Sequence, residues 1–423
     1  MKKVLAFLTL LNICCFILAF AVNISFPFDE WRKGPPIHSF SAYSSGNAQK
    51  IFWVTTACFL DLCFFIIFLF HYILKKKRVS LSNWSYLIIT TMIFMGSFLI
   101  IEYATRLYIK NSPGYTQFRP HPLLYWYNRG NLRDFVGPSN EIPMSTNSYG
   151  FRYKKDIPIN KPANEYRIFV FGDSSAFGSD VRDEETFSAQ LGKKLNDEYG
   201  DYKFRVINTA CPGHTTYQGL IILKQMVLKF NPDIIIVAYN NDPGLEYVEE
   251  KTRAFRNPFI ERLNIILYRS DYYLLFQRVA TDFKLFLLTR PKKKYFPSLV
   301  CRVSLKDYKE NIKEFMRIAK EYNIQILFIK MPVNLHTFEI FPYIKELFYD
   351  ESYRDALTEI CQETNHILVD VDSNWHRKQG QGLFVEFHHE GKVTEAHFHP
   401  SPKGHRKIAE QICDVIAKKR LIH

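Results

Sequence analysis

Apolar residues are distributed very differently in the two parts of the chain. In the first quarter they form three long runs, which are Val4 to about Val22, Ile51 to Leu74, and Tyr86 to about Ile101, the last extendable to Ile109. A helix needs roughly 20 apolar residues to cross a bilayer, and the second run exceeds this length while the others approach it. The pattern predicts a membrane region over residues 1–110 with two or three transmembrane helices.

The basic residues around these runs predict the orientation of the chain. Lys75-Lys76-Lys77-Arg78 lies between the second and third runs, and short loops rich in Lys and Arg stay on the cytoplasmic side. Residues beyond about 110 are then extracytoplasmic. The first run follows Lys2-Lys3 and precedes Ala19-Phe20-Ala21, so it also fits a cleavable signal peptide. We expect a multi-pass protein of the cytoplasmic (inner) membrane with its larger domain outside.

Beyond residue 165 short apolar runs alternate with longer amphipathic segments. The predicted strands are 167–171, 204–209, 233–238, 325–330 and 367–371, and the predicted helices are about 186–198, 215–230, 306–322, 350–363 and 402–419. This alternation predicts an α/β domain over 166–423 with a parallel sheet covered on both faces. Residues 111–165 are interpreted as a linker and N-terminal flap. The aromatic-rich stretch 243–300 is interpreted as a helical insertion, which forms a lid, lies on the membrane or packs on the core.

Most of the side chains suited to catalysis lie where the predicted apolar strands end. Ile168-Phe-Val-Phe-Gly-Asp-Ser174 brings a serine hydroxyl to the edge of the sheet, and 206–213 ends in Pro-Gly213. Asp233 to Ala238 runs into Tyr-Asn-Asn241-Asp, and His397-Phe-His399-Pro precedes the last helix. The carboxyl ends of parallel strands meet at one edge, so these segments are expected to converge. A serine with a histidine base and two N–H donors is suited to acyl transfer.

These four segments, in this order, resemble the blocks of the SGNH (GDSL-type) hydrolase family. Asn147-Ser-Tyr-Gly-Phe-Arg152 and Arg302-Val-Ser-Leu-Lys-Asp-Tyr308 resemble sequences of its membrane-anchored branch. The resemblance implies a flavodoxin-like hydrolase domain, preceded here by the transmembrane helices. It makes Ser174 the nucleophile and His399 the general base. The Ser174 and Gly213 amides and the Asn241 side chain would form the oxyanion hole.

The acid that orients the histidine does not follow the family pattern. The family places it three residues before the histidine, where this chain has Ala396. Glu395 is the nearest carboxylate and is the predicted acid. A distant carboxylate and a Ser–His dyad are the alternatives. A metal site is a further alternative, built from a cluster that comprises His388, His389, His397, His399, Glu386, Glu390 and Glu395. No His-Glu-x-x-His motif is present, and we expect neither a metal nor another cofactor.

The resemblance and the predicted location together imply a membrane-anchored serine esterase that acts on an acylated envelope glycan or a lipid ester. An O-acyltransferase that uses the same residues is one alternative, and a non-catalytic glycan-binding or assembly protein is another. The net charge of +13 includes the cluster Arg290-Pro-Lys-Lys-Lys294, which suits anionic headgroups or glycans. No nucleic-acid module is recognisable, so nucleic acid is not an expected partner. The sequence does not define an oligomeric state.

Overall fold

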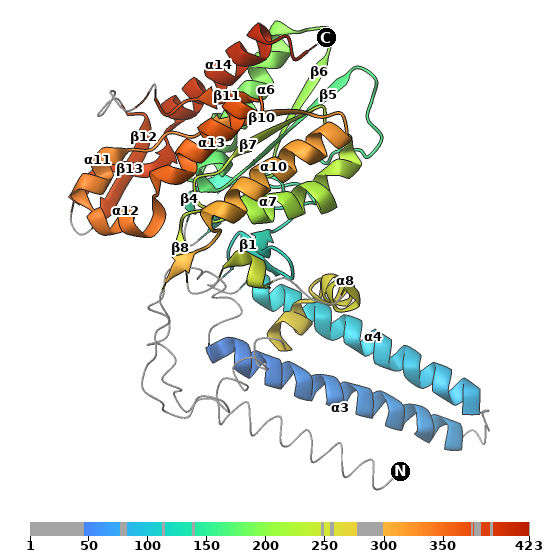
Figure 1. Cartoon of the computed structure of the whole chain (residues 1–423). Helices are drawn as coiled ribbons and strands as arrows, with labels where there is room; N and C mark the ends of the chain where they lie inside the picture. The colour runs from blue at the N-terminus through green and yellow to red at the C-terminus, as the bar shows by residue number, and fades with distance from the viewer. Residues whose placement is uncertain are drawn as a thin grey trace. The chain divides into compact units, whose positions relative to one another are not determined.

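A computed structural model defines the fold (Figure 1). It describes residues 46–76, 83–111, 115–137, 140–246, 249–253, 258–276, 299–373, 375, 382–389 and 392–422. The chain divides into two compact units. The first comprises Met1–Pro122 with Asn257–Tyr295, and the second comprises Leu123–Arg256 with Phe296–His423. The first apolar run, the Lys75–Arg78 loop beyond Lys76 and the basic cluster 290–294 lie outside the described residues.

A parallel sheet forms the centre of the second unit. Its strands are β5 (Glu165–Gly172), β6 (Lys203–Asn208), β7 (Ile234–Ala238), β10 (Gln325–Lys330) and β11 (Ile367–Asp370), in the spatial order β11-β10-β7-β5-β6. Every pair is parallel. This order is that of flavodoxin-like sheets. The side chains of β7 are all buried, because helices cover both faces of the sheet.

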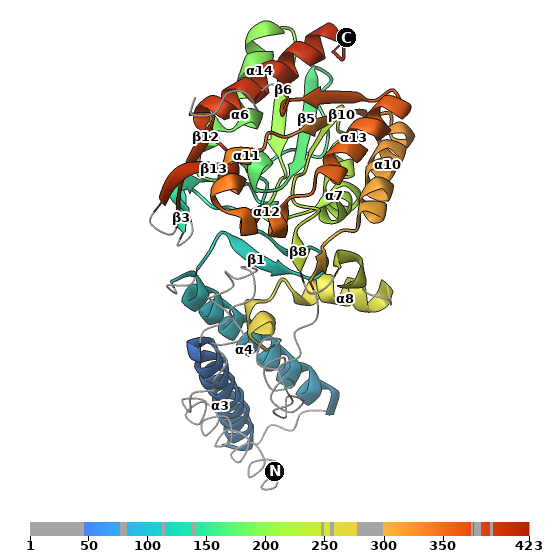
Figure 2. The ribbon, with the colours of Figure 1, turned by 60° about the vertical axis from the view of Figure 1, so that its left-hand side comes forward.

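The helices lie in two layers, one on each face of the sheet (Figure 2). Helices α6 (Phe187–Glu198) and α14 (Pro402–Lys418) pack against each other on one face. On the other face α10 (Leu305–Glu321) packs against both α7 (Thr216–Ile222) and α13 (Glu351–Glu363). The predicted α/β architecture and the predicted strands and core helices are confirmed. One difference is that the helix expected over 215–230 changes after Ile222 to a π-helical turn and a 3-10 turn.

Smaller elements surround the sheet and include one hairpin that the sequence analysis did not predict. Strands β12 (Phe384–His389) and β13 (Lys392–Pro400) pair antiparallel and lead directly into α14. Further elements of this unit include β2 (Tyr125–Asn128), β3 (Phe135–Gly137), β4 (Asn140–Met144), β8 (Leu245–Glu246), β9 (Val300–Cys301), α11 (Leu335–Ile340) and α12 (Pro342–Phe348). The hairpin matters for function because it carries His399.

The first unit contains two long helices that pack together, α3 (Gly46–Lys76) and α4 (Asn83–Lys110). It also contains β1 (Phe118–His121) and α8 (Pro258–Leu267). Residues 91–110 of α4 are long and apolar enough to cross a membrane, and Phe59–Ile73 of α3 is a shorter apolar stretch. In the part of the chain that is described, this is one candidate span, where the sequence analysis expected several.

The middle of the 243–300 insertion packs on α4. The Glu102 carboxylate accepts hydrogen bonds from the Ser270 hydroxyl at 2.6 Å and from the Asp271 and Tyr272 amides at 2.9 and 3.1 Å. Glu102 therefore caps the helical residues 271–276 from the side of a neighbouring helix. Residues 258–276 thus belong to the same compact unit as α3 and α4. Residues 277–298 of the insertion are outside the described chain.

Candidate active site

Ser174 lies where β5 ends and a four-residue helix, α5 (Ser174–Phe177), begins. Asp173 caps this helix by accepting the Ser175 amide at 2.9 Å, and Gly178 ends it in the left-handed region at φ +83°. Gly172 is needed for space, because a Cβ there would lie 2.4 Å from the Ala238 carbonyl oxygen of β7. Ser174 is the first residue of α5, so its N–H has no acceptor within the helix.

The structure brings His399 against Ser174 although 225 residues separate them. His399 Nε2 lies 3.0 Å from Ser174 Oγ, and the imidazole is partly buried with 30% of its side chain exposed. His399 is the second-last residue of β13, and Pro400 and the Ser401 cap of α14 follow it. The hairpin therefore delivers the imidazole to the carboxyl edge of the sheet. This distance allows a proton to pass between the two groups.

The carboxylate beside His399 is Asp180, a distant residue of the kind that the sequence analysis left open but did not name. Asp180 Oδ2 lies 3.0 Å from His399 Nδ1. The hydrogen bond to His399 lowers the pKa of Asp180, and it outweighs partial burial, which acts in the opposite direction. Ser174, His399 and Asp180 thus form a continuous hydroxyl–imidazole–carboxylate line, with each group in hydrogen-bond contact with the next.

Glu395, the acid predicted from sequence, is not placed against His399. Both residues lie on the extended strand β13, where four residues span roughly 13 Å. The Glu395 carboxylate instead accepts the Gly382 amide at 3.0 Å, and its backbone pairs with Glu386. The prediction took Glu395 as the nearest carboxylate in the sequence and did not include a strand over this segment. Because the segment is an extended strand, the Glu395 carboxylate lies beside Gly382 and away from His399.

A buried arginine holds the loop that carries Asp180. Asp180 has a positive φ of +66°, which is uncommon for a residue with a side chain. The Arg152 guanidinium donates hydrogen bonds to the carbonyls of Phe177, Gly178 and Val181 at 2.9, 2.5 and 2.6 Å, and it pairs with Asp183 at 3.0 Å. These bonds fix the backbone immediately before and after Asp180. The Asn147–Arg152 segment therefore supports the acid of the site.

Gly213 has the geometry expected of a backbone donor. It adopts φ +77°, and a Cβ at this position would lie 2.9 Å from the Trp126 ring. The Trp126 indole N–H donates to the Pro212 carbonyl at 2.9 Å, which fixes the peptide that carries the Gly213 N–H. No acceptor takes this N–H within the described part of the chain. It is therefore available to a substrate atom.

Two adjacent asparagines, Asn240 and the predicted Asn241, follow β7. Gly172 of β5 pairs in register with Ala238 of β7, so the two asparagines lie at the same edge of the sheet as Ser174. The Asn240 amide N–H donates to Asp173 Oδ2 at 2.7 Å, and its side-chain Nδ2 is buried with no partner among the described residues. The backbone carbonyl of Asn241 accepts the Gly244 amide at 3.3 Å. The assignment of the Asn241 side chain as an oxyanion donor stays a prediction.

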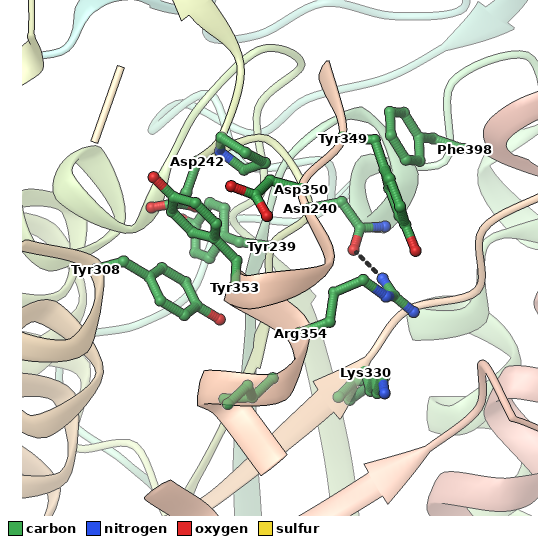
Figure 3. A pocket seen from close by; sticks show the side chains of 13 residues that line it. Tyr239, Asn240, Asp242, Tyr308, Lys330, Tyr349, Asp350, Tyr353, Arg354 and Phe398 are labelled. Carbon is green, nitrogen blue, oxygen red and sulfur yellow. Dashed lines mark hydrogen bonds between the residues drawn. The ribbon is translucent and has the colours of Figure 1, made fainter. Parts of the chain in front are cut away.

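Asn240 also lines a pocket on this side of the sheet (Figure 3). Figure 3 shows its side chain beside Arg354, and the pocket wall includes several aromatic residues, Tyr239, Tyr308, Tyr349, Tyr353 and Phe398. Among these residues, Tyr239 directly follows β7. It is buried, and its ring takes the space that a side chain on Gly219 of α7 would need. The aromatic ring therefore also packs on α7.

Comparisons with known proteins identify this arrangement. The sequence matches the GDSL-like lipase/acylhydrolase family over residues 170–407, which is more than half of the chain. The chain belongs to this family. It is an ester-hydrolysing enzyme of the SGNH (GDSL) class. The matched range includes Ser174, Gly213, Asn240 and His399, and it also includes Asp180.

Solved structures with related folds include two esterase-type proteins. A lipase/acylhydrolase from Enterococcus faecalis is 15% identical, with a TM-score of 0.38, and the match covers 60% of this chain and 96% of that one. An acetylxylan esterase from Geobacillus stearothermophilus is also 15% identical, with a TM-score of 0.36 and coverage of 59% and 94%. These values are too low to carry a substrate over to this GDSL-like hydrolase. No curated protein matches the chain.

Two other histidines of the GDSL-like hydrolase are structural. His405 is fully buried, accepts the Phe187 amide at 3.2 Å through Nδ1 and stacks on the Phe187 ring. His397 packs among the rings of Phe338, Phe348, Phe387 and Phe398. Burial lowers the pKa of each imidazole to about 3. Across the described residues no group of three His, Cys, Asp or Glu side chains is arranged to hold a metal.

A buried carboxylate near the site makes the stability of the GDSL-like hydrolase depend on pH. Burial raises the pKa of Asp242 to about 7, although hydrogen bonds from the Thr216 amide and hydroxyl oppose this effect. The folded state therefore holds this proton more tightly than the unfolded chain, whose aspartate titrates near 4. The stabilisation that protonated Asp242 provides is fully present below about pH 4 and is lost as pH rises through about 7.

We therefore expect the titration of Asp242 to lower the free energy of unfolding by up to about 4 kcal/mol between pH 4 and pH 7. Asp242→Asn should flatten this part of the profile, since its amide oxygen still accepts the Thr216 amide. Urea unfolding of both variants at several pH values measures the effect. Parallel profiles for the two proteins would show that Asp242 does not titrate in this range.

Proposed function

We propose that this GDSL-like hydrolase is a membrane-anchored, extracytoplasmic serine esterase with Ser174, His399 and Asp180 as its catalytic residues. The observation that carries the proposal is the line of two 3.0 Å contacts, from Ser174 Oγ to His399 Nε2 and from His399 Nδ1 to Asp180 Oδ2. This geometry supports a complete triad, where the sequence analysis had left a dyad open. It also argues against a non-catalytic protein on a decayed fold.

The proposed reaction follows from these contacts. His399 Nε2 takes the proton of Ser174 as Oγ attacks the acyl carbon, and Asp180 stabilises the imidazolium. The carbonyl oxygen becomes an oxyanion that is held by the Ser174 and Gly213 amides and by the Asn241 side chain. His399 then gives its proton to the leaving alcohol, which yields an acyl-enzyme. Water, activated by the same imidazole, attacks the acyl-enzyme and releases the acid and free Ser174.

The substrate class and location are inferred from the first part of the chain. The apolar stretch of residues 91–110 in α4 supports an anchor, and the basic residues before it orient that anchor with the later chain outside. Acylated envelope glycans and lipid esters are the esters that such an enzyme would meet. A glycan hydroxyl in place of water would turn the same site into an O-acyltransferase, because only the acceptor differs between the two reactions.

The test of this proposal follows the acyl group. Purified full-length chain is incubated with an activated acetyl ester and an envelope glycan, and acetate in solution is measured alongside acetyl groups on the glycan. An esterase releases acetate without acylating the glycan, whereas a transferase acylates the glycan. Neither product should form with Ser174→Ala. Equal product formation by Ser174→Ala and wild type would exclude Ser174 as the nucleophile.

The two adjacent asparagines give a matched pair for the oxyanion hole. Asn241→Ala should lower kcat about 10²- to 10³-fold, because it removes the proposed donor to the developing negative charge. Asn240→Ala should cause a smaller loss of kcat, since its Nδ2 is buried and its Oδ1 accepts a hydrogen bond from Arg354. Steady-state hydrolysis of p-nitrophenyl acetate measures both. A larger loss of kcat for Asn240→Ala would reverse the assignment.

A further inference from the structure

Helix α8 carries a row of exposed apolar side chains, which we call the α8 apolar face. Its members Phe259, Leu263 and Ile266 are 72%, 44% and 63% exposed, and their spacing of four and three residues places them on one side of the helix. Glu261 and Asn264 lie on the opposite side and are only partly exposed. A helix on the surface of a soluble domain has the reverse arrangement, with apolar residues toward the core. The α8 apolar face is therefore suited to an apolar environment.

The segment that follows α8 packs between the two long helices of the same unit. Within residues 268–276, Tyr272 stacks on Phe52 of α3 with the ring centroids 5.5 Å apart. Leu275 is buried in the same cluster as Phe52 and Ile109 of α4. Phe52 lies near the start of α3, and Ile109 lies near the end of α4. The segment is thus attached to one particular end of the α3–α4 hairpin.

Polar contacts fix the turn between α8 and this segment at the same end of the hairpin. Arg106 Nη2 of α4 donates to the Arg269 carbonyl at 3.0 Å, and Arg119 Nη2 donates to the same carbonyl at 2.7 Å. The Tyr273 hydroxyl donates to Asn264 Oδ1 at 3.3 Å, which ties α8 itself to the segment. With the Glu102 contacts described above, these bonds hold the end of α8 beside the last turns of α4.

The charges of α4 show which level of a membrane this end corresponds to. Residues 91–101 contain no charged side chain, whereas Glu102, Arg106 and Lys110 follow. The uncharged part exposes large apolar side chains, at Met92, Met95 and Leu99. Charged groups avoid the hydrocarbon core, so in a membrane the boundary of the bilayer would lie near Glu102 and Arg106. In the proposed orientation this boundary is the extracytoplasmic one, and α8 is held beside it.

We infer that α8 is an interfacial helix whose apolar face enters the outer leaflet of the bilayer beside the end of α4. A short helix with one apolar face and a polar opposite face lies in the plane of the membrane surface. Arg262 is exposed three residues after Phe259 and four before Ile266, so it borders the face where lipid phosphates would lie. The inference rests on the proposed function, in particular on α4 as a membrane anchor.

A lipid surface is favoured over a protein partner because of what holds α8. The helix is fastened to α4, whose own exposed side chains from residue 92 to residue 99 are apolar and would be surrounded by lipid. A bilayer that surrounds this part of α4 reaches the level of α8 without any further binding event. This reading selects, among the alternatives for the 243–300 insertion, the one in which it lies on the membrane.

The test is photo-crosslinking of the purified full-length chain to lipid. The photoreactive amino acid p-benzoylphenylalanine replaces Phe259 or Ile266, and the chain is reconstituted in phosphatidylcholine vesicles that contain a tritium-labelled phospholipid. Replacement of Leu99, which is 66% exposed on α4, is the positive control, and replacement of Tyr322, which is 53% exposed at the end of α10, is the negative control. Turnover of p-nitrophenyl acetate should equal that of wild type in all four variants, which checks that each is folded.

We expect irradiation to attach labelled lipid at positions 259 and 266 within about threefold of the yield at position 99, because side chains of an interfacial helix reach the acyl boundary. The yield at position 322 should be less than about a tenth of that at position 99, since water surrounds a side chain outside the membrane. Adding Ile266→Glu should lower the lipid yield at position 259, because a charge on the α8 apolar face opposes its insertion.

The outcomes separate the inference from the proposed function. If position 99 is labelled while positions 259 and 266 match position 322, α8 does not enter the bilayer, and the inference is wrong while the anchor stands. Crosslinks from 259 or 266 to protein in place of lipid would also overturn it, because the face would then be covered by this chain or by a second copy. If position 99 is not labelled, the proposed anchor fails and the inference fails with it.

Discussion

His399→Ala should lower kcat for ester hydrolysis by about 10⁵- to 10⁶-fold, which is the scale seen when a triad histidine is removed from another serine hydrolase. The imidazole takes the Ser174 proton during attack and returns it to the leaving alcohol, so both half-reactions lose their proton carrier. Its 3.0 Å contact with Ser174 Oγ is the geometric basis for this expectation. Hydrolysis of p-nitrophenyl acetate under saturating substrate measures kcat directly.

The matched control is His388→Ala. His388 is exposed on β12 in the same hairpin, and it belongs to the histidine cluster that the sequence analysis weighed as a metal site. Its removal should leave kcat within about twofold of wild type. Similar losses from the two variants would mean that the hairpin acts through its structure or through a bound metal. Retained turnover in His399→Ala would show that another group serves as the base.

Asp180→Asn should lower kcat by about 10⁴-fold, as loss of the orienting acid does in another triad enzyme. An amide at this position removes the charge that stabilises the imidazolium, and it permits the wrong tautomer of His399. The hydrogen bond between these residues lowers the pKa of Asp180, so the carboxylate remains ionised throughout the working range of a serine esterase. The melting temperature should change little, because the Asp180 side chain is 46% exposed.

Glu395→Gln is the corresponding test of the residue that the sequence favoured. Its carboxylate accepts the Gly382 amide, and the glutamine oxygen can accept the same bond, so kcat should stay within about twofold of wild type. A large loss in Glu395→Gln together with little loss in Asp180→Asn would reverse the assignment. Equal, small losses in both would favour a Ser–His dyad.

The strands and the Ser174–His399 contact were predictable because both depend on strong local patterns. Fully apolar runs such as Ile234–Ala238 are typical of a buried strand in an α/β alternation, and parallel strands bring their carboxyl ends to one edge. Ser174 and His399 each lie next to such an end or next to the last helix. The sequence therefore located the two side chains that the structure brings into contact, without any knowledge of the loops.

The remaining site residues depend on loop conformation and register, which a single sequence does not define. Asp180 reaches His399 because α5 is only four residues long, Gly178 turns the chain, and Arg152 holds the loop that follows. No signal in the sequence pointed to Asp180.

The most direct test of the account is labelling of the purified full-length chain with a fluorophosphonate probe, which reacts with an activated serine. We predict rapid, stoichiometric labelling of the wild type at Ser174, slower labelling of Asp180→Asn, and none of Ser174→Ala or His399→Ala. Mass spectrometry of the labelled peptide identifies the modified residue. Labelling of Ser174→Ala at the wild-type rate, or no labelling of the folded wild type, would contradict the central claim that Ser174 is an activated nucleophile.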